Sequence, residues 1–332
     1  MMELSTFADQ LSQYISAGEP CLFVVDFELQ KPFLCKLSEA ADEGVFYEVK
    51  GRRNFNSVER LPDVELSADL LDQDLFTERL EEVVRQINAG NSYLLNLTFP
   101  TKIESNLSLE ELFHVAKAPY KLYFKDEFIV FSPESFVKVI GDEVFTYPMK
   151  GTIDARTEHA EQQLLGNQKE EWEHNTIVDL MRNDLAMIAQ NIEVTRYRYL
   201  DRIRNAYGDI LQTSSEIKGQ LPSDWRKTFG HDLLKLLPAG SISGAPKEKT
   251  VEIIQANELD QRGYYTGVFG IFDGRHLDSA VMIRYIEKRD NQLYFRSGGG
   301  ITSQSNAADE YRELLAKIYV GEIGRASCRE RV

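Results

Sequence analysis

Apolar and polar residues alternate over short stretches in much of this chain, which is the pattern of strands that bury one face. The pattern predicts strands at residues 21–27, 32–37, 45–49, 93–99, 120–124, 128–131, 136–140, 144–147, 192–200, 264–272, 279–287 and 292–296. Two hairpins are predicted among them, 120–124 with 128–131, and 136–140 with 144–147 across a turn at Gly141-Asp142.

Helical spacing of apolar residues is found between these groups of strands. It predicts helices from Leu75 to the Ala89-Gly90-Asn91 segment, at 109–116, within 157–189, at 246–256 and at 307–320. Hairpins in groups, separated by blocks of helix, indicate an α+β fold with antiparallel sheets rather than a βαβ array. We expect residues 1–70 to be a strand-rich N-terminal part of the same fold, and residues 71–321 to form its catalytic core. Residues 322–332 have no apolar stripe and are interpreted as a cloning-derived tail.

Composition narrows the class of partner. The formal net charge is −15, which argues against nucleic acid because phosphate backbones need a basic surface. An anionic small substrate would then need local cations from Lys, Arg or a bound metal. No apolar run approaches the roughly 18 residues of a membrane span. The first residues lack a signal-peptide pattern, and the three cysteines form neither a disulfide framework nor a metal motif. We therefore expect a cytoplasmic protein.

Lys150 follows an extended run that breaks at Pro148, and it precedes Gly151. Proline resists helix, and glycine lets the backbone approach another group closely. A lysine amine held at such a strand end and stripped of water has a lowered pKa, which makes it a nucleophile or a base. The alternative, from this segment alone, is an ordinary surface lysine in a turn.

Two segments carry carboxylates that suit a divalent cation. Glu173 extends the apolar stripe of a helix at 172–188, where an unpaired carboxylate is costly, so we expect either an arginine or a hard cation beside it. Glu310 and Glu313 lie one turn apart on a helix that follows three glycines, 298–300. Because a glycine run can present backbone N–H groups to an anion, this segment predicts an anion site beside a metal site.

Two further features suit an anionic substrate. Residues 238–247 form a small-residue loop that opens a helix, although the loop lacks the Gly-Lys-Ser/Thr of a P-loop. The loop still offers helix N-terminal amides and Ser243 to an anion. Arg284 lies within a predicted apolar strand, on one face with Met282 and Ile286. There it is either ion-paired for structure or a fork for a substrate carboxylate.

Several of these segments resemble the signature motifs of the chorismate-utilising enzymes. They are WEHNTIVDLMRND at 172–184, GSISGAPK at 240–247, and the stretch from GGGI at 298–301 to EYRE at 310–313. The family includes anthranilate synthase component I, aminodeoxychorismate synthase component I, and the isochorismate and salicylate synthases. The resemblance covers about residues 75–320. It implies one domain of two packed, mainly antiparallel sheets with helices outside, which binds chorismate and Mg²⁺ in a central cleft.

The resemblance also implies roles for individual residues. Glu173 and Glu313 would be direct Mg²⁺ ligands, and Glu310 would act directly or through water. A second set would bind the substrate and its carboxylates: Arg284, Tyr265, Ser243, Lys247 and the amides of Gly244, Gly299 and Gly300. These groups would supply the local cations that an anionic substrate needs in an acidic protein.

Two positions separate the reactions within this family. Leu94 stands where isochorismate and salicylate synthases have a lysine base that activates water, and where aminating enzymes commonly have glutamine. Lys150 stands where anthranilate synthases have a small residue, and the form PMKGT at 148–152 is that of aminodeoxychorismate synthases. Gln212 stands where many relatives have histidine.

The resemblance thus implies amination of chorismate to 4-amino-4-deoxychorismate, for para-aminobenzoate and folate synthesis. Lys150 would attack C2, and Glu134 would protonate the departing C4 hydroxyl. No cysteine lies in a Gly-x-Cys-x-Gly turn, so ammonia would come from a separate glutamine amidotransferase subunit. The alternatives are an anthranilate synthase component I, an isochorismate synthase and an inactive regulatory homologue.

Overall fold

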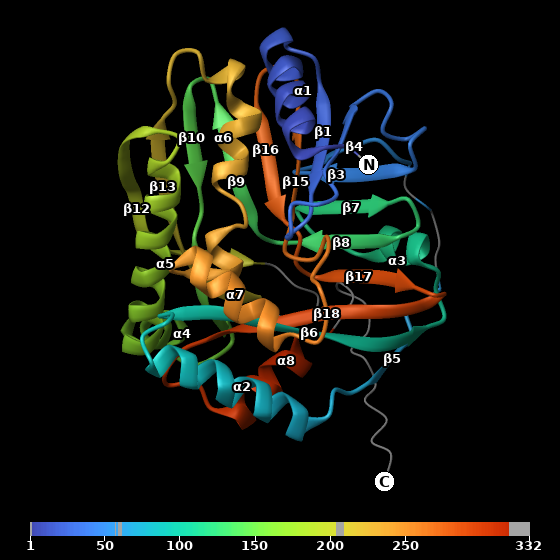
Figure 1. Cartoon of the computed structure of the whole chain (residues 1–332). Coiled ribbons are helices and arrows are strands. Elements are labelled where there is room, and N and C mark those ends of the chain that lie inside the picture. Colours follow the sequence, from blue (N-terminus) through green and yellow to red (C-terminus); the bar gives the residue numbers. More distant parts are fainter. Residues whose placement is uncertain (1, 57, 59–61, 204–208, 319–332) are drawn as a thin grey trace.

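Two antiparallel sheets of nine strands each, with helices packed against them, form the protein (Figure 1). The computed structural model describes residues 2–56, 58, 62–203 and 209–318, and the predicted tail at 322–332 lies outside these ranges. The architecture confirms the α+β class and the antiparallel sheets that the hairpin pattern predicted.

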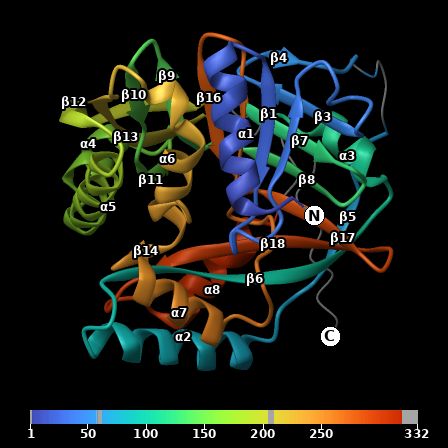
Figure 2. The ribbon, with the colours of Figure 1, turned by 45° about the horizontal axis from the view of Figure 1, so that its top comes forward.

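The first sheet has the strand order β11-β13-β10-β9-β16-β15-β1-β2, and β12 pairs with β13. Its strands are β1 (Cys21–Val25), β2 (Phe33–Lys36), β9 (Ser135–Ile140), β10 (Glu143–Thr146), β11 (Met149–Asp154), β12 (Gln190–Ile203), β13 (Ile210–Gln220), β15 (Val268–Phe272) and β16 (Leu277–Val281). Helices α1 (Leu4–Ala17) and α6 (Phe229–Lys235) pack on each other beside β1. Helices α4 (Ala160–Gly166) and α5 (Gln168–Ala186) cover the end that contains β11 and β13 (Figure 2).

The second sheet has the order β14-β6-β18-β17-β8-β7-β3-β4, and β5 pairs with β6. Its strands are β3 (Val45–Val49), β4 (Arg52–Arg53), β5 (Leu66–Asp69), β6 (Leu94–Ser105), β7 (Tyr120–Phe124), β8 (Phe128–Ser132), β14 (Gly244–Ala245), β17 (Tyr285–Arg289) and β18 (Gln292–Ile301). Helices α2 (Gln73–Asn88), α7 (Lys247–Asn257) and α8 (Ala307–Ala316) lie along β6 and β18, and α3 (Leu109–Val115) packs on β7 and β8.

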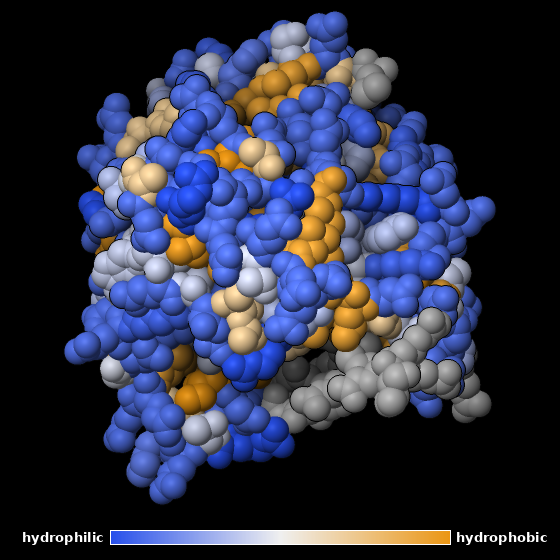
Figure 3. Space-filling model, turned by 60° about the horizontal axis from the view of Figure 1, so that its bottom comes forward, coloured by the Kyte–Doolittle hydropathy of each residue, from blue (hydrophilic) through white to orange (hydrophobic). Residues whose placement is uncertain are grey.

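Both predicted hairpins are confirmed, since β7 pairs with β8 and β9 pairs with β10. The two sheets also pack on each other through a buried cluster that includes Tyr120, Phe269, Met282 and Tyr285. Two further apolar clusters fill the space beneath the helices, and one of them is the largest of the three. On the face at the bottom of Figure 1, apolar residues form small patches that hydrophilic residues separate (Figure 3). No helix in the described part of the chain has both the length and the apolar character needed to cross a bilayer.

The chain passes directly from one sheet to the other at two adjacent places. β8 leads through Pro133 and Glu134 into β9, and β16 leads through residues 282–284 into β17. The two crossings are bonded to each other. Val281 N donates to the carbonyl of Glu134 (3.2 Å), and Phe131 N donates to the carbonyl of Arg284 (3.0 Å). The side chains at both crossings therefore lie where the sheets meet.

The prediction that Arg284 lies inside one strand at 279–287 is wrong. The strand breaks after Val281, and Arg284 has the left-handed backbone angle φ +53° before β17 begins. Met282, Arg284 and Ile286 therefore do not share one strand face. Apolar periodicity continues through the break because both strands are buried, so it does not reveal that the chain changes sheet.

The N-terminal part differs from the prediction because α1 precedes its strands. The predicted helix at 157–189 is two helices, divided at Asn167, whose side chain caps α5 by accepting from the backbone N–H groups of Lys169 and Glu170. The predicted strand at 264–272 begins only at Val268. β13 and α6 lie between residues 200 and 246, where the sequence pattern predicted no helix or strand.

Gly230 permits the close approach of α6 to α1. A Cβ atom on Gly230 would lie 2.0 Å from the carbonyl oxygen of Ala8, a backbone atom that cannot swing aside. We expect Gly230→Ala to lower the free energy of unfolding by about 1–3 kcal/mol, despite the better helix propensity of alanine. Denaturant unfolding measures this loss. The matched control is Gly166→Ala at the end of α4, where nothing lies within 4 Å. Equal stability of the two variants would contradict the packing.

Candidate active site

A cavity of about 210 Å³ lies beside the two crossings. Most of the site residues predicted from the sequence line it: Glu134, Lys150, Ser243, Gly244, Tyr265, Arg284, Gly300 and Glu313. They come from both crossings, from β11 and β18, from the loop before α7 and from α8. The fold therefore gathers residues that lie up to 179 positions apart in the sequence, from Glu134 to Glu313.

Glu173, Glu310 and Gly299 lie outside the cavity wall but next to residues that form it. The Oε2 atom of Glu173 is 3.0 Å from Nζ of Lys150. A Cβ atom on Gly299 would be 3.4 Å from Oε2 of Glu310 and 3.7 Å from Oε1 of Glu313. The predicted metal ligands of α5 and α8 thus approach the same edge of the cavity from two helices.

Lys247 is not brought to the cavity, although it was predicted to bind substrate. Its Nζ lies 3.0 Å from Oδ1 of Asp184 and donates to the carbonyl of Leu236 (3.0 Å). Burial raises the pKa of Asp184, and the Lys247 ammonium and a backbone N–H oppose that shift. In this arrangement Lys247 fastens the start of α7 to α5.

The glycines of the site allow strands to approach each other closely. Gly244 has φ +136°, and a Cβ there would lie 1.9 Å from the carbonyl oxygen of Leu94 on β6. The run 298–300 lies inside β18, whereas the sequence predicted that the strand ends before it. Residues 297–301 of β18 pair only with β6, since β17 pairs with 292–296. The other edge of the glycine run is thus open toward the cavity, which suits an anion site.

Lys150 lies at an irregularity of β11, where the pairing with β13 shifts register and Gly151 has φ +78°. Its side chain is 26 % exposed, and its partner Glu173 is 9 % exposed. Burial acts to lower the pKa of Lys150, but the carboxylates of Glu173, Glu170 and Glu313 outweigh burial, and the pKa is raised. The predicted lowered pKa is wrong for this arrangement, because the amine is held as an ammonium ion. Likewise, the group beside Glu173 is a lysine and not an arginine.

Glu134 lies on the first crossing and faces the same cavity. Ser241 Oγ donates to its Oε1 atom at 2.5 Å. Burial raises the pKa of Glu134 above that of an ordinary carboxyl group, although Ser241, Arg284 and Lys150 oppose this. A carboxyl group that keeps its proton to higher pH is suited to proton donation.

The carboxylates near Gly299 have the donor chemistry for a hard cation such as Mg²⁺. Burial raises the pKa of Glu310, and the neighbouring carboxylate of Glu313 raises it further. The hydrogen bond that Ser305 donates to Glu310 opposes this shift. Lysines neutralise the other two: Lys169 and Lys150 lie beside Glu173, and Lys317 lies 2.7 Å from Glu313. In the described ranges, no three His, Cys, Asp or Glu side chains are close enough together to hold a metal. The carboxylates fit a hard cation by their chemistry, but in this arrangement Glu173 and Glu313 are paired with lysines and not gathered around one point.

Among the cavity residues to which sequence reasoning gave no role are two polar ones, Lys317 and Ser241. Lys317 Nζ donates to the carbonyl of Gly298 (2.6 Å) and to Glu313. Its position four residues after Glu313 on one helix could have revealed the pair. Ser241 could not have been found, because Glu134 is 107 positions away in the sequence. Leu94 and Gln212, which depart from the resemblance, also line the cavity.

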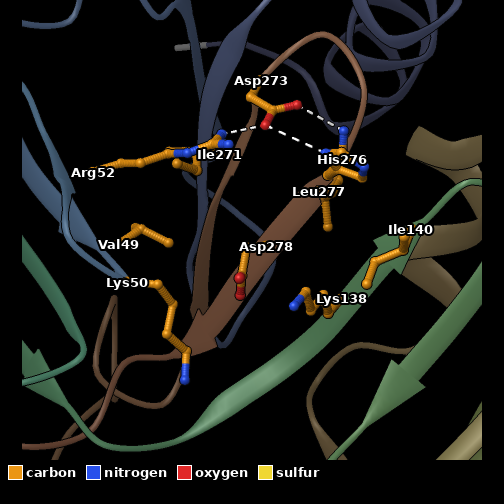
Figure 4. A pocket seen from close by; sticks show the side chains of 10 residues that line it. All are labelled: Val49, Lys50, Arg52, Lys138, Ile140, Ile271, Asp273, His276, Leu277 and Asp278. Atoms are coloured by element: carbon orange, nitrogen blue, oxygen red, sulfur yellow. Dashed lines mark hydrogen bonds and ion pairs between the residues drawn. The ribbon is translucent and has the colours of Figure 1, made fainter.

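A second cavity, of about 280 Å³, lies between the β3–β4 turn, β9 and the β15–β16 hairpin. Asp278 points into its middle, between Lys50 and Lys138, and Arg52 pairs with Asp273 at its rim (Figure 4). Tyr120 Oη donates to Asp278 at 2.8 Å. No residue predicted from the sequence lines this cavity, so the candidate active site is the cavity at the crossings.

Residues 23–320 match the sequence profile of a family described as chorismate binding enzyme. The chain belongs to this family. It is therefore a member of the chorismate-utilising enzymes, as the motifs predicted, and its fold is the one that these enzymes share.

Three relatives show how far the similarity extends. An uncharacterized PabA-like protein of Haemophilus influenzae is 52 % identical over 95 % of this chain and 96 % of its own length. Aminodeoxychorismate synthase component 1 of Bacillus subtilis is 28 % identical over 74 % of this chain and 54 % of its own length. Anthranilate synthase component I of Streptococcus pneumoniae has a crystal structure that superposes with a TM-score of 0.66. It is 28 % identical and covers 78 % of this chain and 60 % of its own.

The raised pKa of Glu134 predicts how stability depends on pH. The folded state binds this proton more tightly than the unfolded chain. The resulting stabilisation is complete below the ordinary carboxyl pKa and is lost as pH rises through the raised pKa. Glu134→Gln cannot ionise. Its free energy of unfolding should therefore increase relative to the parent as pH rises above the ordinary carboxyl pKa, by roughly 1.4 kcal/mol for each pH unit between the unfolded and folded pKa values.

Denaturant unfolding of both proteins at a series of pH values measures this difference. The control is Glu81→Gln, which changes an exposed carboxylate of α2 and should show little pH-dependent change relative to the parent. A relative stability of Glu134→Gln that stays constant with pH would show that Glu134 has an ordinary pKa.

Proposed function

We propose that this chain is an aminodeoxychorismate synthase component I, which converts chorismate and ammonia to 4-amino-4-deoxychorismate for para-aminobenzoate and folate synthesis. The observation that carries the proposal is Lys150 in the cavity wall. A Cβ on Gly300 would lie 3.4 Å from Nζ of Lys150 and 3.4 Å from Cδ1 of Leu94. A primary amine therefore borders the cavity beside an apolar side chain that cannot activate water. The aminodeoxychorismate synthase relative in Bacillus subtilis supports the same reaction.

The first step is attack of the Lys150 amine on C2 of chorismate. Because only a neutral amine has a free electron pair, the ammonium ion must first lose a proton. Glu173, with its carboxylate 3.0 Å from Nζ, is the nearest acceptor. As the C2–N bond forms, the ring double bonds shift and the C4 hydroxyl departs. Glu134 gives that hydroxyl its proton, so that water leaves.

In the second step ammonia adds at C4, the double bonds shift back, and the C2–N bond to Lys150 breaks. The proton that the added ammonia nitrogen loses returns to the Glu134 carboxylate, which restores the acid. The sum is chorismate plus ammonia giving 4-amino-4-deoxychorismate and water. The covalent intermediate divides one difficult displacement at C4 into two easier ones. Lys150 is regenerated at the end and pairs again with Glu173.

Substrate carboxylates would be held by the cations of the cavity and by backbone amides. Arg284 and Lys317 supply positive charge on two sides, and the open edge of β18 supplies the N–H group of Gly300. Glu173, Glu310 and Glu313 would hold a Mg²⁺ ion, which supplies positive charge opposite the ring carboxylate. Ammonia would come from a glutamine amidotransferase, since no cysteine of these 332 residues lies in a Gly-x-Cys-x-Gly turn.

The second candidate function is that of an anthranilate synthase, in which ammonia attacks C2 directly and pyruvate is lost. The structural similarity to the Streptococcus pneumoniae enzyme favours it. A lysine at position 150 argues against it, because anthranilate synthases have a small residue where this chain has Lys150.

Product analysis tests the reaction. With chorismate, an ammonium salt and Mg²⁺, the purified chain should form 4-amino-4-deoxychorismate, and glutamine should not replace ammonium. Lys150→Ala should bind chorismate with similar affinity but lose C4 amination by about 10²-fold or more, because no covalent intermediate forms. Mass spectrometry of the products, and of a chorismate-derived adduct on Lys150, measures both. Parental C4 amination by Lys150→Ala would refute the nucleophile, and anthranilate from the parent would favour the second candidate.

Metal binding is tested separately from turnover. Glu313→Gln replaces a charged oxygen ligand by a neutral amide and should weaken Mg²⁺ binding by about tenfold or more in calorimetry. The matched control is Asp309→Asn, which makes the same kind of change one turn earlier on the same helix. Asp309 pairs with Arg312, so its substitution should leave Mg²⁺ affinity unchanged. Full activity in excess chelator would exclude a metal-dependent reaction.

A further inference from the structure

Arg262 is among the most deeply buried large side chains of the protein, with 1 % of its surface exposed. All five N–H groups of its guanidinium have acceptors. Nε and Nη2 form a fork with the carboxylate of Glu258 (2.9 and 2.6 Å). Nη2 also donates to the carbonyl of Asn96 (2.6 Å). Nη1 donates to the carbonyl of Ile242 (2.9 Å) and to Oγ1 of Thr266 (3.2 Å).

The acceptors outside the ion pair share one property. Asn96, Ile242 and Thr266 all line the cavity of the candidate active site, and they come from β6, from the loop before α7 and from the turn before β15. Glu258 adds to the connection on β6, because its Oε1 accepts from the backbone N–H and the hydroxyl of Thr98 (2.9 Å each). One buried ion pair thus joins three separate walls of the cavity.

Thr266 is held in a conformation that its side chain disfavours. It has φ +60°, and a β-branched residue in the left-handed region is strained. Its hydroxyl accepts from Arg262 and donates to the carbonyl of Tyr265 (2.6 Å), and its N–H donates to the carbonyl of Met282 (2.8 Å). This last bond reaches the second crossing, two residues before Arg284. Glycine would adopt this angle without strain, so the threonine persists because its hydroxyl is bonded on both sides.

We propose that Arg262 and Glu258 are positioning residues that hold Thr266 in its left-handed conformation, and that this sets the place of Tyr265 and of the Arg284 crossing for chorismate binding. The inference rests on the assignment of this cavity as the chorismate site. The physical reason is that three cavity walls from different parts of the chain must be aligned together, and a saturated, buried guanidinium allows only one arrangement of its acceptors.

Variants of Thr266 test the proposal by calorimetric titration with chorismate and Mg²⁺, without ammonium. Thr266→Gly removes the strain together with the hydroxyl, so the fold should keep its Tm within about 3 °C, while chorismate affinity should fall by about tenfold or more. Thr266→Ser keeps the hydroxyl and should bind within about threefold of the parent. The control is Asn291→Gly, another residue with positive φ (+62°) in the β17–β18 turn, and it should bind chorismate as the parent does.

The role of Arg262 is tested by a double-mutant cycle. If Arg262 acts through Thr266, the variant with both Arg262→Lys and Thr266→Gly should bind chorismate about as weakly as Thr266→Gly alone, whereas independent effects would multiply. The proposal is overturned if the two substitutions weaken chorismate binding independently, so that their factors multiply. It is also overturned if Thr266→Gly binds chorismate as the parent does, or if Thr266→Ser and Thr266→Gly lose the same affinity. If Arg262→Lys does not fold, the Thr266 variants decide alone. A parent that binds chorismate but makes another product would refute only the proposed reaction.

Discussion

The cavity of the candidate active site depends on one constraint. The chain passes between the two sheets at two crossings, which are joined by backbone hydrogen bonds. β-strands bury their polar backbone in ladders, and a crossing is where the ladder stops and side chains at the break turn toward the space between sheets. Glu134 and Arg284 occupy these breaks, and the hydrogen bonds from Val281 and Phe131 join the two crossings. The backbone geometry of the crossings thereby brings an acid and a cation to the same cavity.

Charge pairing is the second principle of this site. The chain carries a formal net charge of −15, yet Lys150, Lys317 and Arg284 gather around one cavity. Carboxylates of α5 and α8 hold two of these cations. Because these side chains are partly buried, an unpaired charge would cost free energy of folding, and pairing with an opposite charge offsets that cost. The same pairing raises the pKa of Lys150 and keeps its amine protonated in this structure.

Two glycines of the cavity and the hydrogen bonds of Arg262 fix the positions of the backbone segments that form the cavity wall. Gly244 and Gly298 let β14 and β18 approach β6 closely, since a Cβ at either position would meet a carbonyl oxygen of β6. Arg262 then fastens β6 to the loop before α7 and to the turn at Thr266. The cavity wall is therefore defined by backbone contacts, which leaves the lining side chains free for chemistry.

The sequence by itself determined the fold class, both hairpins and eight of the residues that line the cavity, because alternation and motif spacing are local properties of a chain. It also determined the family, through motifs whose order along the chain is specific. Only the tertiary structure decided which charged side chains pair with each other and where they lie. Glu173 faces Lys150 and Lys169 rather than an arginine, Lys247 is bound to Asp184, and Arg284 lies at a change of sheet rather than inside a strand. These outcomes depend on which segments meet in space, and neither periodicity nor spacing carries that information when the partners are far apart in the sequence.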